Sequence, residues 1–200
     1  MNILKKTIQY IKSLDINNLP PIYNLNWIKP KNFYSKILKS ETIHLIDLGA
    51  RWGSIDELKS LEKHIYYVGF DADQKEIKKL QSYQNNYKHK KYIHAFISEK
   101  KGVVNFFLYK KAAASSVYKY KKSFIDWFQN DIYYIDKEVE MNSSSLDEMT
   151  NIDVDIIKLD TQGNEFEILN GGSEALEKTL MVECEVEFYE IYDGQKLSHD

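Results

Sequence analysis

Between residues 42 and 98, short apolar runs alternate with segments in which apolar residues have helical spacing. The runs "TIHLIDLG", "YYVGFDAD" and "KYIHAFIS" predict buried strands over 42–49, 66–73 and 91–98. In "SIDELKSLEKH" and "QKEIKKLQSY", apolar residues recur every third or fourth position, which predicts helices over 54–64 and 74–83. Strands that alternate with helices in this way favour a parallel sheet with right-handed crossovers.

The remaining segments extend this pattern. We expect strands over 100–110, 153–160 and 180–192, and helices over 122–136 and 164–172. Residues 1–40 predict an N-terminal helical extension that is interrupted by Pro20 and Pro21. Residues 41–200 then predict a single α/β domain, within which 110–135 forms an insertion.

The net charge and the cysteine content bear on the expected binding partners and on the expected compartment. The formal net charge of the 200 residues is −3, so the whole molecule gives no electrostatic reason to bind nucleic acid or an anionic membrane. The distribution is uneven, because 100–123 contains seven lysines and no acid. A lone cysteine, Cys184, and an N-terminus without an uninterrupted apolar run predict a cytoplasmic protein with no membrane span.

A glycine loop follows the first predicted strand. Asp47, Gly49 and Gly53 form D-x-G-x-x-x-G, and Asp71 ends the second strand, 22 residues past Gly49. Nucleotide-binding folds place an acid there to bind ribose hydroxyls. A dinucleotide site needs G-x-G-x-x-G, and a carboxylate at Asp47 would repel pyrophosphate but suits a cationic cofactor such as S-adenosylmethionine. The alternative is a structural glycine turn in which Asp47 acts as a cap.

Six motifs occur in an order that resembles the FkbM-type methyltransferases. They run from about Ile43 to Gln195: "IDLGARWG", "VGFDAD", "AFISEKKG", "SLDEM", "DIIKLDTQGNEFEILNGG" and "EVEFYEIYDGQ". The resemblance implies an α/β, Rossmann-like class I methyltransferase fold, a mostly parallel twisted sheet with helices on both faces. It also implies S-adenosylmethionine as cofactor and a hydroxyl group of a sugar, glycan or natural product as methyl acceptor.

The same resemblance implies which positions hold the cofactor. Asp71 would bind the ribose, Phe96 and Ile97 would border the adenine, and the loop would line the amino-acid and sulfonium side through Asp47, Gly49, Ala50, Arg51 and Gly53.

Two departures from the family pattern affect these expectations. Arg51, the only arginine of the chain, and "FDAD" stand where the family usually has Ala-Asn and Glu-Pro. We expect Arg51 to grip the cofactor's carboxylate or an acid such as Asp160 or Glu165; the alternative is a surface ion pair with Asp73. The sequence also ends before the usual final helix and antiparallel strands. A sheet without its final strands would expose an edge that needs a partner or a further C-terminal segment to cover it.

Methylation of a hydroxyl group needs a base, and acids at strand ends are the candidates. Asp160 ends the strand "DIIKLD", and Glu165 begins the next helix; the alternative role of both is helix capping. Glu183, Glu185 and Glu187 alternate along the last predicted strand, and we expect Lys158 to pair with an acid. No spacing of histidine, cysteine and acids indicates zinc, and no metal is expected, although the acids of "DVDIIKLD" leave a divalent metal as an alternative.

Substrate contacts are expected from the insertion 110–135. It contains "KKAAASSVYKYKKSF", which is basic and aromatic and offers Ser115, Ser116 and Tyr118. Aromatic rings stack on sugars and lysines attract anionic groups, although an ordinary loop with solvated lysines would have the same composition. Two other functions stay open: a non-catalytic cofactor-binding module, and an RNA methyltransferase, against which the absence of an Asn-Pro-Pro-Tyr-like motif counts.

Overall fold

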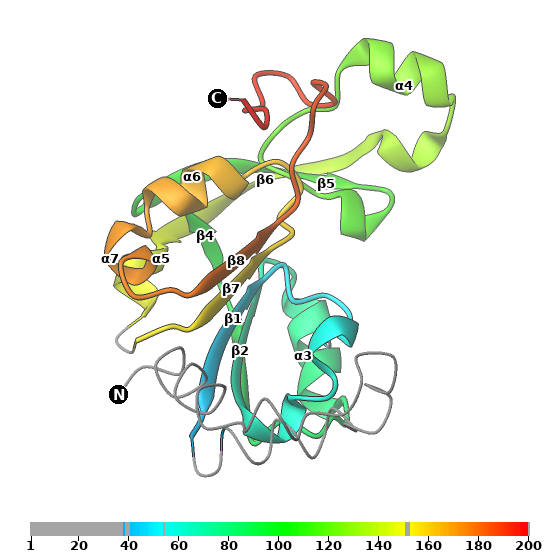
Figure 1. Ribbon diagram of the computed structural model, residues 1–200. Coiled ribbons are helices and arrows are strands. Elements are labelled where there is room, and N and C mark those ends of the chain that lie inside the picture. Colours follow the sequence, from blue (N-terminus) through cyan, green and yellow to red (C-terminus); the bar gives the residue numbers. More distant parts are fainter. Residues whose placement is uncertain (1–37, 39–40, 54, 151–152, 200) are drawn as a thin grey trace, which may run out of the picture.

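A five-stranded sheet, parallel throughout, forms the centre of the molecule (Figure 1). The computed structural model describes residues 38, 41–53, 55–150 and 153–199, so the expected N-terminal extension lies outside the described residues except for Leu38. The strands have the order β3-β2-β1-β7-β8. They are β1 (Ile43–Leu48), β2 (Ile65–Asp71), β3 (His89–His94), β7 (Ile156–Leu159) and β8 (Met181–Cys184). This order confirms the Rossmann-like fold.

Each face of the sheet has its own core. The longest described helix, α3 (Gln74–Ser82), covers one face, where Ile77 and Leu80 pack with Leu45 and Tyr67. Three short helices cover the other face (Figure 1): α5 (Leu146–Met149), α6 (Glu165–Asn170) and α7 (Ser173–Leu176). A central parallel strand buried on both sides explains why β1 reads as a continuous apolar run.

A second, three-stranded sheet was not expected from the sequence. It has the order β4-β6-β5, in which β4 (Phe96–Ser98) is parallel and β5 (Gly102–Tyr109) antiparallel to β6 (Ile135–Ser145). The prediction of one strand over 91–98 is therefore wrong, because the chain leaves the first sheet at Ala95 and continues in the second. The prediction of one helix over 122–136 is also wrong, because the helix covers only Lys122–Phe128 and β6 begins at Ile135.

The segment expected to be a helix over 54–64 is also different. It contains two 3₁₀ turns, η3 (Asp56–Leu58) and η4 (Glu62–His64). The apolar residues Ile55, Leu58 and Leu61 are spaced by three, which matches the three residues per turn of a 3₁₀ helix better than the 3.6 of an α-helix.

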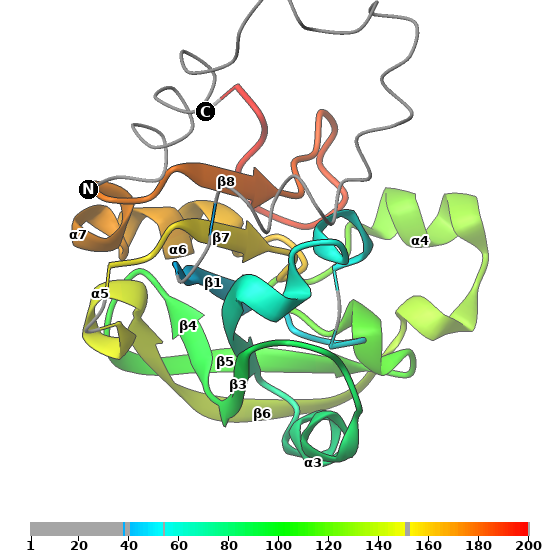
Figure 2. The same ribbon diagram turned by 60° about the horizontal axis from the view of Figure 1, so that its bottom comes forward.

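The insertion between β5 and β6 folds around aromatic side chains. It contains η5 (Ala112–Ala114), α4 (Lys122–Phe128) and η6 (Asp131–Tyr133). The helix ends because Gln129 takes a left-handed conformation with φ 47°. Tyr120 lies at the centre of the aromatic group and packs against the tilted ring of Tyr192, with ring centroids 4.4 Å apart. Both views show α4 standing away from the two sheets (Figures 1 and 2).

The last predicted strand, 180–192, is much shorter than expected. Only Met181–Cys184 pair with β7, because β7 itself ends at Leu159 and offers no further ladder partner. One more backbone bond follows, from Glu185 N to Leu159 O, and the chain then continues without regular structure. Among the described residues β8 is an edge strand of its sheet. No helix in the described ranges is both long and apolar enough to cross a bilayer.

Candidate functional site

A cavity of about 870 Å³ lies at the carboxyl ends of β1, β2 and β7. The chain runs outward from β1 to β3 and then returns to β7 on the other side of β1, so this is the point where the strand order reverses. The second sheet and the insertion supply the opposite wall. Residues from the first sheet and its loops include Gly49, Arg51, Trp52, Asp71 and Asp160; those from the second sheet include Phe96, Ile97, Phe106, Val139 and Met141.

The loop after β1 passes very close to the end of β7. Gly49 N donates to Phe70 O on one side, and Asp160 N donates to Leu48 O on the other, each at 3.0 Å. Gly49 has φ +83°, and a Cβ at this position would lie 1.9 Å from the Asp160 carbonyl oxygen. Only glycine fits this position, because both the backbone angle and the neighbouring strand exclude a side chain.

Asp47 lies beneath this loop and does not line the cavity. Its side chain is 4% exposed, accepts a hydrogen bond from the Tyr67 hydroxyl at 2.6 Å and faces the Lys158 ammonium at 3.5 Å. Burial raises the pKa of Asp47, and the charge of Lys158 opposes that shift. The expected acid partner of Lys158 is thereby confirmed. Ala50 is fully buried, and Gly53 packs against α3 and β3; neither lines the cavity.

Asp71 is the last residue of β2 and lines the cavity. It is 8% exposed, and its Oδ1 accepts a 2.7 Å hydrogen bond from the backbone N–H of Asp73. Within the described part of the chain no hydrogen bond engages its other oxygen. Burial raises the pKa of Asp71, while the Asp73 N–H and the Arg51 charge act in the opposite direction. The carboxylate therefore has one oxygen fixed and one available.

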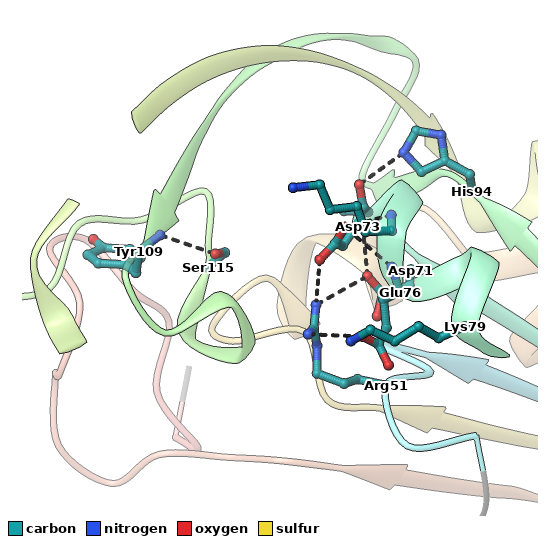
Figure 3. A network of polar contacts seen from close by, with 10 residues as sticks. Arg51, Asp71, Asp73, Glu76, Lys79, His94, Tyr109 and Ser115 are labelled. Atoms are coloured by element: carbon teal, nitrogen blue, oxygen red, sulfur yellow. Dashed lines mark hydrogen bonds and ion pairs between the residues drawn. The ribbon is translucent and has the colours of Figure 1, made fainter. Parts of the chain in front are cut away.

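Arg51 joins the loop to the start of α3 (Figure 3). Its guanidinium donates to Asp73 Oδ2 at 3.2 Å and to Glu76 Oε2 at 3.4 Å, and lies 3.9 Å from Asp71 Oδ1. The expected pairing with Asp160 or Glu165 is wrong, because the cluster of acids around the start of α3 lies closer to Arg51. The alternative partner, Asp73, is the one observed, together with a buried Glu76.

Asp160 lines the cavity on the opposite side from α3 and belongs to a pair of carboxyl groups. The Gln162 amide donates to Asp160 Oδ1 at 3.1 Å and to Glu185 Oε2 at 3.4 Å. Desolvation, and then the charge of Asp160 and a hydrogen bond with it, raise the pKa of Glu185 to about 7. The sequence predicted an acid at Asp160 but did not single out Glu185 from its neighbours, because the alternation Glu183-Glu185-Glu187 does not say which one meets Asp160.

Glu165 lies outside the cavity and holds the turn that carries Asp160. Its Oε1 accepts from the Thr161 backbone N–H at 2.6 Å and from the Thr161 hydroxyl at 2.9 Å, and Oε2 accepts from Gly163 N–H at 2.9 Å. Both oxygens of this buried carboxyl are occupied. The turn also contains Gln162 in a left-handed conformation with φ 61°, an unusual backbone for a residue with a side chain.

The three substrate residues expected in the insertion fall into different places. Ser115 lines the cavity, and its hydroxyl oxygen accepts a hydrogen bond from the backbone N–H of Tyr109 on β5. Ser116 is buried and donates to the Gln162 carbonyl at 2.6 Å, so it fixes the Asp160–Gly163 turn. The Tyr118 hydroxyl donates to Glu167 on α6 at 2.6 Å. Of the three, only Ser115 faces the cavity.

The described residues contain no group of three or more histidine, cysteine, aspartate or glutamate side chains arranged to hold a metal ion. The polar side chains that line the cavity include carboxylates, hydroxyls, the amides of Gln74 and Gln162, His94, Arg51 and three lysines, Lys75, Lys110 and Lys111.

Residues 47–200 match the model of the methyltransferase FkbM domain. A crystal structure of methyltransferase FkbM from Methylobacillus flagellatus KT is a distant structural match, with 13% identity and a TM-score of 0.42. That match covers 80% of this chain, which spans 43% of the length of the crystallised protein. The comparison with curated proteins gave no match. Because the domain model covers well over half of the sequence, the chain belongs to the FkbM methyltransferase family.

Proposed function

We propose that the protein is an S-adenosylmethionine-dependent O-methyltransferase that acts on a hydroxyl group of a sugar, glycan or natural product. One observation carries this proposal. A single cavity joins Asp71, with one carboxylate oxygen available, to Asp160, which Gln162 links to Glu185 behind the cavity lining. The first group suits a ribose, and the second suits a base for a hydroxyl nucleophile.

The residues present fit the cofactor. Asp71 would accept hydrogen bonds from the ribose hydroxyls through its available oxygen, and Phe96 and Ile97 offer an apolar wall for the adenine ring. Gly49 and Arg51 line the cavity beside Asp71, on the side assigned to the amino-acid part. Asp47 and Ala50 support this loop from below, and Gly53 anchors it to α3. When bound, the cofactor supplies an electrophilic methyl group on a positively charged sulfur.

Asp160 and Glu185 together would receive the proton of the acceptor hydroxyl. Burial and then the charge of Asp160 raise the pKa of Glu185 to about 7, near neutrality, where a general base is most effective. Glu165 and Ser116 then act as positioning residues, because they hold the turn from which Asp160 and Gln162 project. General-base catalysis of this kind contributes about a hundred- to ten-thousand-fold in rate.

The acceptor would enter between the first sheet and the insertion. Ser115, Lys110 and Lys111 line that part of the cavity, together with the rings of Tyr109 and Tyr120. Aromatic faces and hydroxyl donors suit a sugar, and the lysines suit an anionic substituent.

Cys184, which forms no disulfide within the described residues, accords with a reducing compartment such as the cytoplasm.

The test is methyl transfer from labelled S-adenosylmethionine to a panel of sugars, glycans and hydroxylated small molecules. We expect a product with one added methyl group on oxygen, and loss of at least about a hundredfold in kcat in Asp160→Asn. Glu183→Gln is the matched control, since this exposed neighbour of Cys184 carries no side-chain hydrogen bond within the described residues. Cofactor binding without transfer to any acceptor would support a non-catalytic module instead, and transfer to RNA would contradict the proposed acceptor class.

A further inference from the structure

The motif "EVEFYEIYDGQ" near the C-terminus ends in a turn that is closed by its own glutamine. Gln195 is buried, and its Oε1 accepts hydrogen bonds from the backbone N–H groups of Ile191 and Tyr192, each at 3.3 Å. Its Nε2 donates to Glu187 Oε2 at 2.7 Å. These contacts hold Tyr192 in a defined place, with only 1% of the residue exposed.

The insertion fixes this turn from the other side. Tyr120 and Tyr192 pair as an isolated antiparallel bridge, in addition to the packing of their rings. A further backbone hydrogen bond runs from Lys121 N to Ile191 O at 2.9 Å. The position of Tyr192 is therefore set by two parts of the chain, the insertion and the C-terminal turn.

The hydroxyl group of Tyr192 contacts the side-chain amide of Gln162. Its oxygen lies 3.2 Å from Gln162 Oε1 and 3.0 Å from the hydroxyl oxygen of Tyr120. A hydroxyl group has one hydrogen to donate, and an amide oxygen can only accept. Tyr192 therefore donates to Gln162 and accepts from Tyr120, which lines the cavity.

This contact determines which end of the Gln162 amide faces the two acids. With Oε1 bound to Tyr192, Nε2 donates to Asp160 Oδ1 at 3.1 Å and to Glu185 Oε2 at 3.4 Å. A reversed amide would place its oxygen against two carboxyl groups that accept hydrogen bonds when ionised. It would lose both donor contacts, so the hydroxyl of Tyr192 and the two acids select the same orientation.

The backbone of Gln162 is strained in the same place. Its φ of 61° is left-handed, a conformation that few residues with a side chain adopt. Ser116 donates to its carbonyl oxygen at 2.6 Å, and the ring of Tyr192 packs against the next residue, Gly163, where an added Cβ would lie 3.1 Å from it. Strain that neighbouring contacts enforce is typical of functional sites. Here it accompanies a side chain that reaches the candidate base.

We propose that the amide of Gln162 positions Asp160, and that the hydroxyl of Tyr192 fixes the orientation of this amide. Both are positioning residues, and Tyr120 supports them from the cavity wall. The proposal deepens the proposed function and rests on it, because it takes Asp160 and Glu185 as the groups that receive the proton. It gives the C-terminal motif a part in the site, although Tyr192 itself does not line the cavity.

The amide also affects the protonation of the acids. The other charged groups that act on this pair are Lys158 on β7, 3.8 Å from Asp160 Oδ2, and the carboxyl groups of Glu165 and Glu187. Among the described residues, Gln162 alone donates side-chain hydrogen bonds to both acids. A hydrogen bond to an ionised carboxyl group lowers its pKa. Loss of the amide should therefore raise the pKa of Glu185 above its value of about 7.

Two variants test this arrangement. Gln162→Asn keeps an amide on a residue that tolerates a left-handed backbone, but its side chain is one methylene too short to reach both acids. Tyr192→Phe removes only the hydroxyl group. In Gln162→Asn, the rise of kcat/KM with pH should move up by roughly 0.5–1 pH unit, the effect of one lost hydrogen bond, and kcat at pH 7 should fall about tenfold. Tyr192→Phe should change both in the same direction but less.

Affinity for the cofactor separates positioning of the base from damage to the cavity. Binding of S-adenosylhomocysteine, measured by calorimetry, should change less than about twofold in both variants, because Asp71 and the apolar wall are unaltered. The double variant should match Gln162→Asn in its pH dependence, since Tyr192 acts through Gln162 and two residues in one network do not have additive effects.

Tyr118→Phe is the matched control. It removes a hydroxyl group of the same insertion, and its ring also lies beside Gly163, but its hydrogen bond goes to Glu167 on α6 at 2.6 Å. This variant should have a lower unfolding temperature, while kcat and the pH dependence stay like those of the unchanged protein. It therefore shows what a loosened insertion does when Gln162 keeps its partner.

A second readout does not require turnover. Carbon NMR of the full chain labelled at glutamate carboxyl groups, with Glu185 assigned by its absence in Glu185→Gln, should give a titration midpoint near 7 that increases in Gln162→Asn and Tyr192→Phe. If the unchanged chain methylates no acceptor, the proposed function fails, and this titration still tests the positioning.

Three results would overturn the proposal. They are a midpoint and a pH dependence that stay unchanged in folded Gln162→Asn and Tyr192→Phe, an equal shift in Tyr118→Phe, and additive shifts in the double variant. Unfolding temperatures measured at the same pH will show which variants are folded.

Discussion

Gly49 is the residue at which the loop after β1 meets the end of β7. The absence of a side chain lets the Asp160 carbonyl approach, and this close contact brings the loop after β1 and the end of β7 together at the cavity. The sequence predicted a glycine turn here from D-x-G-x-x-x-G. It could not predict the contact with Asp160, because the residues are far apart along the chain.

We expect Gly49→Ala to destabilise the protein by more than about 3 kcal/mol, since the new Cβ would overlap the Asp160 carbonyl and the backbone angle is unfavourable for alanine. Gly194→Ala is the matched control: its φ of +78° is similar, but nothing lies within 4 Å of the added Cβ. That variant should lose only about 1 kcal/mol. Chemical denaturation of both variants measures the difference, and equal losses would show that the Asp160 contact is unimportant.

The carboxyl pair predicts how activity depends on pH. Because the pKa of Glu185 is raised to about 7, Glu185 holds a proton below that value and acts as a base above it. The rate of methyl transfer should therefore rise as pH increases through about 7. The same shift makes the contribution of Glu185 to the free energy of unfolding decrease as pH rises from about 4.5 to about 7.

In Glu185→Gln, the rising limb of kcat/KM near pH 7 should be lost, because the carboxyl group whose pKa is about 7 is removed. Glu183→Gln should keep the limb of the unchanged protein. A limb that stays near pH 7 in Glu185→Gln would remove Glu185 from the pair.

At the scale of elements, the turn between β7 and α6 holds the candidate base Asp160 in place. Glu165 accepts three hydrogen bonds from this turn, and Ser116 ties it to the insertion. The sequence predicted both roles for Glu165, base and helix-terminal anchor, and could not choose between them. Burial and the occupied oxygens favour the anchor.

Glu165→Gln should lower the free energy of unfolding by about 1.5–3 kcal/mol, because charge-assisted bonds to Thr161 and Gly163 are lost. Glu174→Gln on α7 should change it little, as the Glu174 side chain is exposed. Thermal and chemical denaturation provide the measurement. If Glu165→Gln kept full stability and lost turnover, Glu165 would be a base and not an anchor.

The elements that sequence analysis missed share a physical cause. β6 reads "IDKEVEMNSSS", in which charged residues fall on both faces, so its strand structure depends on pairing with β4 and β5. β1, β2 and β7 were predictable because burial on both faces makes most of their residues apolar. The local residue pattern therefore identified the buried parallel strands. It failed for β6, because pairing with strands distant in the sequence determines that this segment is a strand.

At the scale of the molecule, the two sheets and the insertion enclose one cavity, and the candidate residues reach it from all three. The sequence placed Gly49, Asp71, Phe96, Ile97 and Asp160 there through strand ends and family motifs. It also assigned Asp47, Glu165 and Ser116 to direct contacts, whereas the structure buries them beneath the cavity walls, because a motif reports which residues matter and not how far each is from the ligand.

The most direct measurement is calorimetric titration of the full chain with S-adenosylhomocysteine. The account predicts binding at a single site, roughly 10- to 150-fold weaker in Asp71→Ala, the effect of losing charge-assisted hydrogen bonds to the ribose. Asp136→Ala, at another acid of the same cavity, should bind like the unchanged protein. No binding by the unchanged chain, or equal affinity in Asp71→Ala, would contradict the claim that this cavity is the cofactor site.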